Sequence, residues 1–351
     1  MKTADSNSPW RITLDTNPDF CNLNCIMCED HSPYSEPRNN RKKAGTLRPI
    51  MKRDLMEKVI REAASLGVSE VIPSTMGEPL LYPYFDDILS LCNELDLTLN
   101  LTTNGTFPSR EKYHNVEYWA ERITPVGSDV KISWNGATDK THEEVMLGTK
   151  LPEHIKNVKR FIVVRDKVAA ETNHYCSITM QLTFMDVNKH EIVDMVKLAL
   201  KLGFDRVKGH HLWAHFPEIQ NQSMRRNIQS IEFWNNIVRE CQKIVALHNL
   251  NNTKQCRLDN FFELDVTQIE NISPGGECPF LGKEAWVDPN GSFNVCCAPD
   301  QQRKILGDFG NLNSQSLKQI WAGDDYIKLN KDYLSRPLCQ GCNMRRPVEI
   351  M

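Results

Sequence analysis

Three cysteines near the beginning of the chain have a spacing that suits one metal centre. Cys21, Cys25 and Cys28 stand at C-x3-C-x2-C spacing within the segment PDFCNLNCIMCEDH. A short loop can turn all three thiolates toward one point, and thiolates are the ligands that iron–sulfur clusters use. Three cysteines leave one iron of a 4Fe–4S cluster without a protein ligand, and that iron can bind a substrate or cofactor. Zinc is the alternative, with His31 as a fourth ligand.

A second set of cysteines lies farther along the chain. Four thiolates, enough to close a full cluster, come from Cys278, Cys296, Cys339 and Cys342. Residues 285–296 predict a β-hairpin with a Pro-Asn-Gly turn that delivers Cys296, while Cys297 is spare. A zinc ribbon is the alternative for this set. The cysteines without partner spacing are expected to be buried thiols, namely Cys92, Cys176, Cys241 and Cys256.

Alternating strand and helix patterns must position the first set. Predicted strands lie at 11–15, 68–73, 97–102, 129–134, 176–183 and 204–209. Predicted helices lie at 52–66, 82–95, 151–166 and 187–202, and 216–250 is polar and then helical. Residues 29–50 are expected to form a surface loop, whose basic run 38–43 is either solvated or in contact with an anionic substrate. This order predicts an α/β fold with a partial (β/α)6 TIM-like barrel.

Polar residues follow the predicted strands, and in such barrels function sits at the carboxyl ends of the strands. The candidates in chain order are Met76, Gly77, Glu78, Asn104, Ser133, Thr179 or Gln181, His210, Trp213 and His215. Gly77 permits a tight turn with close backbone approach. His210, Trp213 and His215 either face a substrate, with His210 or His215 as a base, or serve packing and loop hydrogen bonds.

Composition narrows the class of protein. The 351 residues allow two or three domains and a sizeable core, and the net charge of -3 gives no general nucleic-acid signal. The first residues contain no apolar signal segment, and no run approaches the roughly 20 apolar residues of a membrane span. Twelve cysteines in a chain without an export signal indicate metal or redox use and a cytoplasmic location.

The motifs together resemble those of the radical S-adenosylmethionine (SAM) family. The C-x3-C-x2-C loop resembles that family's cluster loop, which implies that Cys21, Cys25 and Cys28 hold a 4Fe–4S cluster. Met76-Gly77-Glu78-Pro79 is similar to the Gly-Gly-Glu-Pro motif that binds the SAM amino group, with Met76 in place of the first glycine. The resemblance also implies that Asn104 helps to shape the SAM site, that Ser133 meets the ribose, and that Gln181 meets the carboxylate or ribose.

One departure from the usual pattern and one further match lie beside the fourth strand. Residues 132–137 resemble the family's segment there, but Asn135 stands where the family usually has Asp. His142 looks like part of the following helix start, so we expect it to be structural.

The later cysteines resemble the shortened SPASM, or twitch, extension of radical SAM enzymes. That extension holds one auxiliary 4Fe–4S cluster, which implies that Cys278, Cys296, Cys339 and Cys342 are its ligands. The implied domains are a radical SAM core at 1–222, a connecting helical segment at 223–255, and a small α+β auxiliary-cluster domain at 256–351.

The resemblance implies an oxidoreductase-type enzyme that reductively cleaves SAM to a 5′-deoxyadenosyl radical and abstracts hydrogen from a substrate C–H bond. An auxiliary cluster can take a second electron, so the expected outcome is net oxidation. An electron donor such as flavodoxin or ferredoxin is implied as a partner. The expected substrate is a small polar metabolite or natural-product precursor of the sugar or aminocyclitol type, because the 20 residues before Cys21 leave no room for a leader-binding domain.

Two alternatives stay open at this point. One is radical modification of a ribosomal peptide or protein side chain, by oxidation, cross-linking or epimerisation. The other is a two-cluster electron carrier or redox sensor without enzyme activity, which would need neither the turn at 76–79 nor Ser133.

Overall fold

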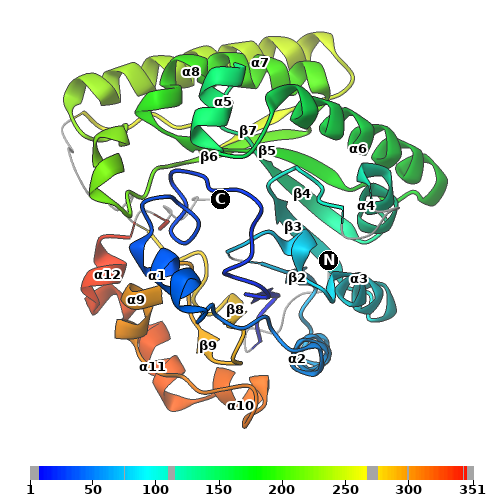
Figure 1. Cartoon of the computed structure of the whole chain (residues 1–351), viewed down its shortest axis with the longest axis vertical. Coiled ribbons are helices and arrows are strands. Elements are labelled where there is room, and N and C mark those ends of the chain that lie inside the picture. Colours follow the sequence, from blue (N-terminus) through cyan, green and yellow to red (C-terminus); the bar gives the residue numbers. More distant parts are fainter. Residues whose placement is uncertain are drawn as a thin grey trace. The chain divides into compact units, whose positions relative to one another are not determined.

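The computed structural model describes residues 8–74, 76–109, 115–266, 276–298, 300–342 and 344–345. The chain divides into two compact units (Figure 1). Unit 1 consists of Met1–Pro18, Arg48–Leu99 and Asn271–Met351, and unit 2 of Asp19–Leu47 and Asn100–Glu270. The division falls within strand β3 (Thr98–Thr103), so this strand contributes its first residues to unit 1 and its last to unit 2.

Unit 2 is built on strands with helical crossovers between them. Its strand order is β7-β6-β5-β4-β3, and β4 through β7 pair in parallel. The strands are β4 (Gly127–Ser133), β5 (Ser177–Phe184), β6 (Arg206–His211) and β7 (Arg257–Asp259). The helices are α1 (Glu36–Ala44), α4 (Val116–Ile123), α5 (Asp139–Val145), α6 (Leu151–Thr172), α7 (Ile192–Leu202) and α8 (Ile228–Asn251).

The strands of unit 2 have one apolar face and one polar face, because successive side chains point to opposite sides of a strand. On β4 the buried Val130 and Ile132 alternate with Asp129, Lys131 and Ser133. Helices α6, α7 and α8 run along these strands (Figure 1) and bury the apolar face. The polar face is therefore left to carry chemistry.

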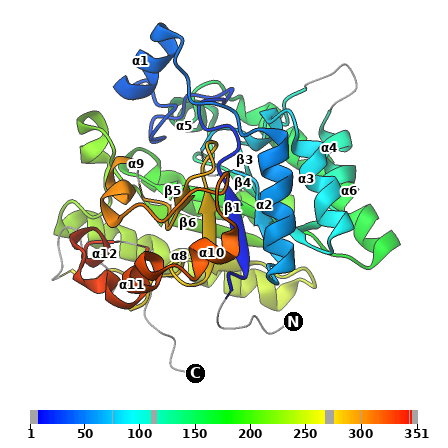
Figure 2. The ribbon, with the colours of Figure 1, turned by 90° about the horizontal axis from the view of Figure 1, so that it is seen from below.

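Unit 1 has the strand order β3-β2-β1-β8-β9, in which β1 pairs in parallel with both β2 and β8. Its strands are β1 (Arg11–Leu14), β2 (Glu70–Ile72), β8 (Glu284–Val287) and β9 (Phe293–Asn294). Helices α2 and α3 pack against each other (Figure 2). The helices are α2 (Arg53–Ser65), α3 (Phe85–Glu94), α9 (Asp300–Arg303), α10 (Leu317–Trp321), α11 (Asp324–Asp332) and α12 (Pro337–Gln340).

The six predicted strands are confirmed as β1 to β6, each shifted at its ends by a few residues at most. The hairpin predicted at 285–296 is confirmed as the antiparallel pair β8 and β9. The four cysteines expected to be buried thiols, Cys92, Cys176, Cys241 and Cys256, are buried.

The prediction of a surface loop at 29–50 is wrong in part, because α1 occupies its middle. Pro37 lies in the first turn of α1, where a missing N–H costs nothing, and Gly45 ends the helix in the left-handed conformation. The compact units interleave segments from the whole chain, and the domain boundaries at 222 and 255 stay a prediction.

Candidate functional site

The loop that carries Cys21, Cys25 and Cys28 lies in unit 2 and donates backbone N–H groups to its own sulfurs. The N–H of Leu23 points at the Cys21 sulfur and that of His31 at the Cys28 sulfur, each at 3.4 Å. Such N–H donors favour the thiolate form that binds iron. Each of the three cysteines is partly exposed as a residue.

A cluster of buried apolar side chains packs against this cluster loop. The buried Leu23 belongs to a cluster with Val145, Met146, Met185 and Leu212, against which Cys21 and Cys25 pack. The loop also makes strand-like hydrogen bonds to the end of α5, from the N–H of Asn24 to Leu147 O and from that of Ile26 to Val145 O, both 3.0 Å. Gly148 allows this approach, since a Cβ there would meet the Leu23 side chain at 3.1 Å.

Ion pairs from α1 fix the two ends of the loop. Arg41 makes two hydrogen bonds to the buried Asp19 carboxylate, at 2.9 and 2.8 Å, and reaches Asp30 at 3.2 Å. Arg38 is buried, with its guanidinium 3.5 Å from Asp19 O. Part of the basic run at 38–43 thus holds the cluster loop in place, a structural role beyond the two the sequence suggested.

Asn104, at the end of β3, lies against the cluster loop. Its side-chain N–H donates to Asn22 Oδ1 at 2.8 Å and lies 3.7 Å from the Cys21 sulfur. Gly105 follows with a φ of +74°, and a Cβ there would overlap the His154 ring at 2.0 Å. The Asn-Gly turn therefore places an amide beside the first cysteine.

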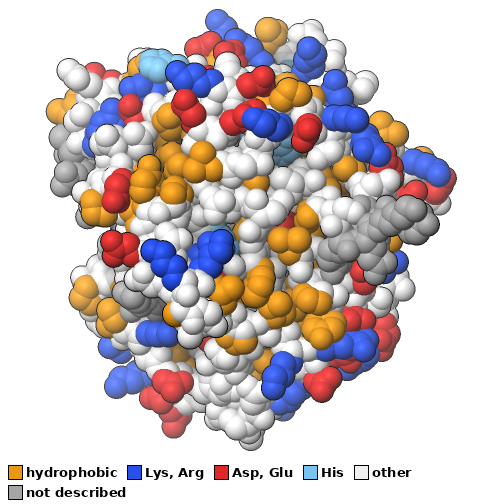
Figure 3. Space-filling model, in the orientation of Figure 1, with side chains coloured by type: hydrophobic (Ala, Val, Ile, Leu, Met, Phe, Trp, Pro, Cys, Tyr) orange, Lys and Arg blue, Asp and Glu red, His pale blue; other side chains and the backbone are white. Residues whose placement is uncertain are grey.

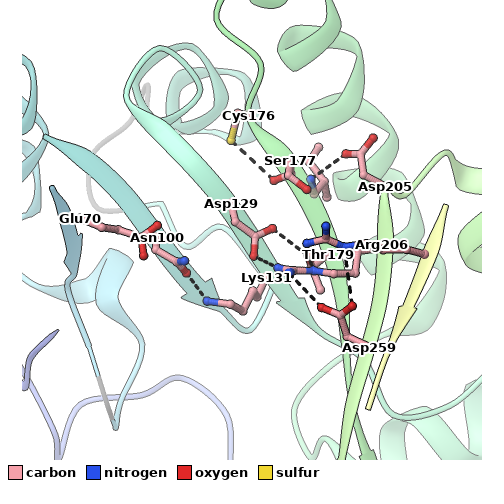
Figure 4. Close-up of polar contacts among 12 residues, drawn as sticks. Glu70, Asn100, Asp129, Lys131, Cys176, Ser177, Thr179, Asp205, Arg206 and Asp259 are labelled. Atoms are coloured by element: carbon pink, nitrogen blue, oxygen red, sulfur yellow. Dashed lines mark hydrogen bonds and ion pairs between the residues drawn. The ribbon is translucent and has the colours of Figure 1, made fainter. Parts of the chain in front are cut away.

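A closed ionic network fills the polar face of β4 to β7 near the beginnings of the strands (Figure 4). Arg206 contacts Thr179 at 2.8 Å and Asp259 at 3.1 Å, and it also pairs with Asp129. Thr179 donates to Asp129 at 2.7 Å. These contacts satisfy Thr179 within the network, so of the two polar residues proposed on β5, Gln181 is the one left for a ligand.

Nearer the carboxyl ends of the same strands, the polar groups are open. Ser133 is paired in register with Gln181, and its hydroxyl makes no hydrogen bond to another described residue. Gln181 Nε2 faces His210 Nδ1 at 3.1 Å, so the amide donates and the ring carries its proton on Nε2. The Ser133 hydroxyl and the far side of the His210 ring are therefore free to meet a ligand.

The histidines after β6 are neutral. Although the His210 ring keeps solvent contact, the protein atoms around it and then Lys208 lower its pKa to about 4. Burial lowers the pKa of His215, an effect that the Asp30 carboxylate of the cluster loop opposes. The rings of Trp213 and His215 are parallel, with centroids 6.4 Å apart. Ala214 and Phe216, on either side of His215, pack against the same apolar cluster as the loop residue Leu23, so His215 lies near the cluster loop.

Asn135 and His142 are structural. Asn135 Oδ1 accepts from the N–H of Thr183 at 2.8 Å, which ties the end of β4 to β5. His142 Nε2 lies 3.0 Å from His154 Nδ1, and both rings pack on Trp134. Burial lowers the pKa of His142 to about 4, so the pair is neutral. The expectation that His142 is structural is confirmed.

The Met76-Gly77-Glu78 turn lies in unit 1, after β2. Gly77 has a φ of +76°, the left-handed conformation that glycine adopts without strain. The buried Glu78 carboxylate accepts the N–H of Leu80 at 3.2 Å and caps a 3₁₀ turn, Pro79–Leu81. Asn17 donates to Glu78 O at 2.8 Å. Glu78 is thus engaged in shaping the turn, while its role toward SAM stays a prediction.

The later cysteines all belong to unit 1. Burial, and then the Cys278 and Cys342 thiols, raise the pKa of Cys296 to about 11. Burial, and then the Cys296, Cys278 and Cys342 thiols, raise the pKa of Cys339 to about 11. The N–H of Leu281 points at the Cys278 sulfur at 3.4 Å. Gly291 turns the hairpin with a φ of +85°, and a Cβ there would meet Asn313 at 2.5 Å.

Both cysteine sets fit the groups assigned to them. In each set, backbone N–H groups point at cysteine sulfurs, an arrangement that also suits the sulfurs of a bound cluster. As they stand, no three His, Cys, Asp or Glu side chains of the described ranges lie in coordinating geometry. Binding would then require the side chains to turn inward and the thiols to lose their protons.

Several residues that build this site carry no signal in the sequence. Asp19, Asp30 and Arg41 act through a contact between the cluster loop and a helix that the pattern did not show. Glu191 accepts from the N–H groups of Ala137 and Thr138, at 2.7 and 3.0 Å, across more than 50 residues of chain. Only the fold reveals such pairs.

One face of the molecule carries charges of both signs (Figure 3). Basic and acidic side chains are interspersed on the face shown in Figure 3, in keeping with the net charge of -3. None of the helices in the described ranges combines the length and the apolar composition that crossing a membrane requires.

Comparison with known families identifies both cysteine sets. The model of the Radical SAM superfamily matches residues 18–212, more than half of the chain, and that of the SPASM iron–sulfur cluster-binding domain matches 278–343. A tungsten-containing aldehyde ferredoxin oxidoreductase cofactor-modifying protein of Pyrococcus furiosus is 23% identical over 94% of this chain and 86% of its own. A GTP 3′,8-cyclase of Clostridium perfringens is 27% identical over 56% of this chain and 52% of its own.

Solved structures share the fold. SuiB of Streptococcus suis bound to S-adenosylmethionine has a TM-score of 0.64 at 16% identity, over 97% of this chain and 73% of SuiB. The enzyme anSMEcpe with bound AdoMet has a TM-score of 0.65 at 14% identity, over 95% and 88%. The predicted partial barrel with a SPASM-like extension is thereby confirmed, and the implied cofactors are a 4Fe–4S cluster, an auxiliary cluster and SAM. The chain belongs to the radical SAM superfamily and carries a SPASM domain.

Proposed function

We propose that this protein reductively cleaves SAM and uses the 5′-deoxyadenosyl radical to abstract hydrogen from a C–H bond of a small polar molecule, with net two-electron oxidation. The observation that carries this proposal is the cluster loop of unit 2. Three partly exposed cysteines lie in one loop, with backbone N–H groups aimed at sulfur and Asn104 beside the first of them.

The residues of the chain have distinct tasks in this proposal. Cys21, Cys25 and Cys28 hold the cluster, which when bound supplies the electron that breaks a C–S bond of SAM. Asn104 orients the loop at Cys21, and the free hydroxyl of Ser133 receives the ribose. The backbone of the turn at Met76 and Gly77 meets the SAM amino group, since carbonyl oxygens accept from an ammonium.

The substrate lies toward the residues after β6. His210, fixed by Gln181, donates a hydrogen bond through Nε2, and its lowered pKa keeps it neutral. The rings of Trp213 and His215 are nearly parallel, and the face of an aromatic ring can pack against the apolar face of a sugar-like ring. His215 is the better base of the two histidines, because the Asp30 carboxylate favours its protonated form.

The second cysteine set is our reason for favouring net oxidation over redox-neutral chemistry. Cys278, Cys296, Cys339 and Cys342 would hold an auxiliary cluster, which would supply an acceptor for the second electron of the oxidation. A flavodoxin- or ferredoxin-type protein supplies the first electron.

The substrate class rests on the relatives. The Pyrococcus relative is named for modifying a cofactor and the Clostridium relative for cyclising GTP, and both names point to molecules other than peptides. A peptide is the second candidate, because SuiB, which shares the fold, has been solved bound to its precursor peptide SuiA. We favour the small molecule because the sequence relatives, unlike these neighbours, exceed 20% identity.

The experiment compares both substrate classes in one assay. The reconstituted protein is incubated without oxygen with SAM, dithionite and either sugars, aminocyclitols and nucleotides or a peptide library. We expect a product two mass units lighter than a small polar substrate, formed with 5′-deoxyadenosine. The Cys339→Ala/Cys342→Ala variant is expected to keep part of the SAM cleavage and lose that product. Oxidised product from peptides alone would contradict the substrate class, and full product from the double variant would contradict the role of the auxiliary cluster.

A further inference from the structure

Two neighbouring arginines before α8 differ in their surroundings. Arg226 pairs with Asp186 and donates to Ser223 O at 2.9 Å. The guanidinium of Arg225 makes no hydrogen bond, ion pair or aromatic contact with another described residue, although it is only partly exposed. Burial without a partner lowers the pKa of Arg225. A desolvated guanidinium of this kind needs an anion to offset its lost hydration.

The carboxylate that lies near these arginines is already engaged. Asp186 accepts from Lys189 at 2.8 Å as well as from Arg226, so its single negative charge is shared between two cations. Arg225 therefore adds an unbalanced positive charge to this part of unit 2.

His211, the last residue of β6, is a second polar group without a partner. Its side chain is buried, with 8% relative exposure, and neither ring nitrogen has a hydrogen-bond partner. Burial first, and then the positive charge of Arg225, lower the pKa of His211 to about 3. The ring is thus neutral and has one N–H to donate. Backbone pairing brings Arg225 near it, because Phe184 pairs with His211 and the next residue, Met185, forms a bridge with Ser223, two residues before Arg225.

The first turn of α8 adds donors of the same kind. Asn227 caps the helix by accepting the N–H of Ser230 at 2.8 Å. The N–H groups of Ile228 and Gln229 precede any intrahelical bond and remain for another acceptor. A helix N-terminus favours negative charge, yet the chain places Arg225 and Arg226 before it. The positive charge collected here is consistent with a bound anion.

We propose that Arg225 and His211, with the first turn of α8, bind the carboxylate or phosphate group of a small anionic ligand. Arg225 supplies the charge and a two-pronged donor, and His211 supplies one N–H. The site lies at the carboxyl end of β6 on the face that α8 covers, because His211 pairs in register with Phe184 and packs on Trp234. His210 points to the opposite face of the strand, so this site is separate from the open polar groups beside His210. Anion binding here does not depend on the proposed function.

The experiment measures how fast phenylglyoxal labels individual arginines, with the labelled peptides mapped by mass spectrometry. Phenylglyoxal attacks the neutral guanidine, so an unpaired arginine with a lowered pKa reacts before a paired one. We expect Arg225 to be labelled faster than Arg226, the internal control. Inorganic phosphate or acetate should slow the labelling of Arg225 by about tenfold at saturation, as a charge-assisted contact requires, while potassium chloride of equal ionic strength should not.

The comparison of phosphate with acetate tells which anionic group the site prefers. The His211→Phe variant keeps the aromatic packing with Phe184 and Trp234 and removes the N–H donor. It should fold as well as the parent protein and show weaker protection by the anion. Equal labelling of Arg225 and Arg226, or no protection by either anion, would overturn the site, and unchanged protection in His211→Phe would overturn the role of that residue.

SAM itself also carries a carboxylate and is therefore tested alone. Protection of Arg225 by SAM in place of phosphate or acetate would overturn the separation of this site from the SAM site. Because labelling requires no turnover, protection by an anion in a protein that fails to cleave SAM would sink the proposed function and leave this site standing.

Discussion

Polar side chains of unit 2 fall into two groups according to the partners within their reach. Asp129, Thr179 and Arg206 satisfy one another near the beginnings of their strands, so they stabilise the sheet and have little left for a ligand. Ser133 and Gln181 lie farther along the same strands, where their neighbours are other open groups. Whether a polar residue of these strands stabilises the sheet or remains open to a ligand therefore depends on its position along the strand, not on its residue type.

Gly105 shows how tightly the framework fits around the site. Replacing it with alanine would cost about 1 kcal/mol for the left-handed backbone and roughly 1–3 kcal/mol more for overlap with His154. Gly67 is the matched control, since it has a φ of +89° but open space around it. We expect Gly67→Ala to show the backbone cost alone in urea unfolding followed by circular dichroism. Equal losses in the two variants would contradict the packing described for the Asn-Gly turn.

At the scale of elements, α5 and the residues after it pack against the cluster loop and support it. Hydrogen bonds join Val145 and Leu147 to the loop, and Glu191 holds the start of α5 through Thr138 and Thr141 at 2.7 and 2.5 Å. A carboxylate at a helix N-terminus is also favoured by the helix dipole. Glu191 therefore acts on the cysteines from a distance, through the position of α5.

Removal of the Glu191 carboxylate tests this coupling. Glu191→Ala should lower the free energy of unfolding by roughly 1.5–3 kcal/mol, as expected for lost hydrogen bonds to a charged group, and should lower the iron bound after reconstitution. Glu144→Ala removes an exposed carboxylate from the same helix and should change stability by about 0.5 kcal/mol or less. Iron retention equal to that of the parent protein in Glu191→Ala would contradict the coupling.

The same carboxylate gives a pH dependence with a definite sign. Although partial burial raises the pKa of Glu191, the hydrogen bonds from Thr141 and Thr138 lower it overall. Its contribution is therefore present above the unfolded value of about 4.3 and is lost as pH falls through the lower folded value. The stability gap between the parent protein and Glu191→Gln should shrink below about pH 4. A gap that is constant down to pH 3 would argue against a charged cap.

The elements that sequence reasoning found are those with a strong local pattern. Strands β1 to β6 combine apolar runs with turn residues, and these local preferences agree with the fold. Helix α1 was missed because only Arg38 of its residues is buried, so its sequence shows no apolar stripe. Strand β7 has three residues, RLD, and its strand character comes from pairing with β6. Local patterns cannot reveal such tertiary pairing.

At the scale of the whole molecule, the SPASM region shares a sheet with the first strand of the chain. Within unit 1, β8 pairs in parallel with β1 along Arg11–Leu14, and Glu284 accepts from Thr13 and lies 3.6 Å from Arg11. The N–H of Leu317 donates to Glu62 of α2 at 2.8 Å. These contacts join residues more than 250 positions apart, so the region contributes to the fold besides carrying cysteines.

A shortened chain separates the contribution of the SPASM region to folding from that of its cysteines. A protein ending at residue 266 lacks β8, which leaves one edge of β1 without its neighbour and open to aggregation. We expect it to melt below the metal-free full-length protein in circular dichroism. The full-length Cys339→Ala/Cys342→Ala variant keeps β8 and should melt close to the metal-free parent. Equal melting of the shortened chain and the parent would contradict a structural role for this pairing.

The candidate site was predictable where spacing alone carries the chemistry. The three cysteines of the cluster loop stand within eight residues, and the hairpin before Cys296 follows from its turn residues. Arg225, His211 and Glu191 were not predictable, because their importance lies in what surrounds them: a missing partner, buried nitrogens and a distant helix end. How far a side chain is buried, and whether it has a hydrogen-bond or ion-pair partner, depends on the fold.

The most direct test of the central claim is reductive cleavage of SAM. The reconstituted protein, the Cys21→Ala/Cys25→Ala/Cys28→Ala variant and Cys241→Ala, which changes a buried thiol of α8, are incubated without oxygen with SAM and dithionite. Formation of 5′-deoxyadenosine is followed by chromatography with mass detection. We predict 5′-deoxyadenosine from the parent protein and from Cys241→Ala, and none from the triple variant, because the cluster needs its three thiolates. Cleavage of SAM by the triple variant would contradict the account.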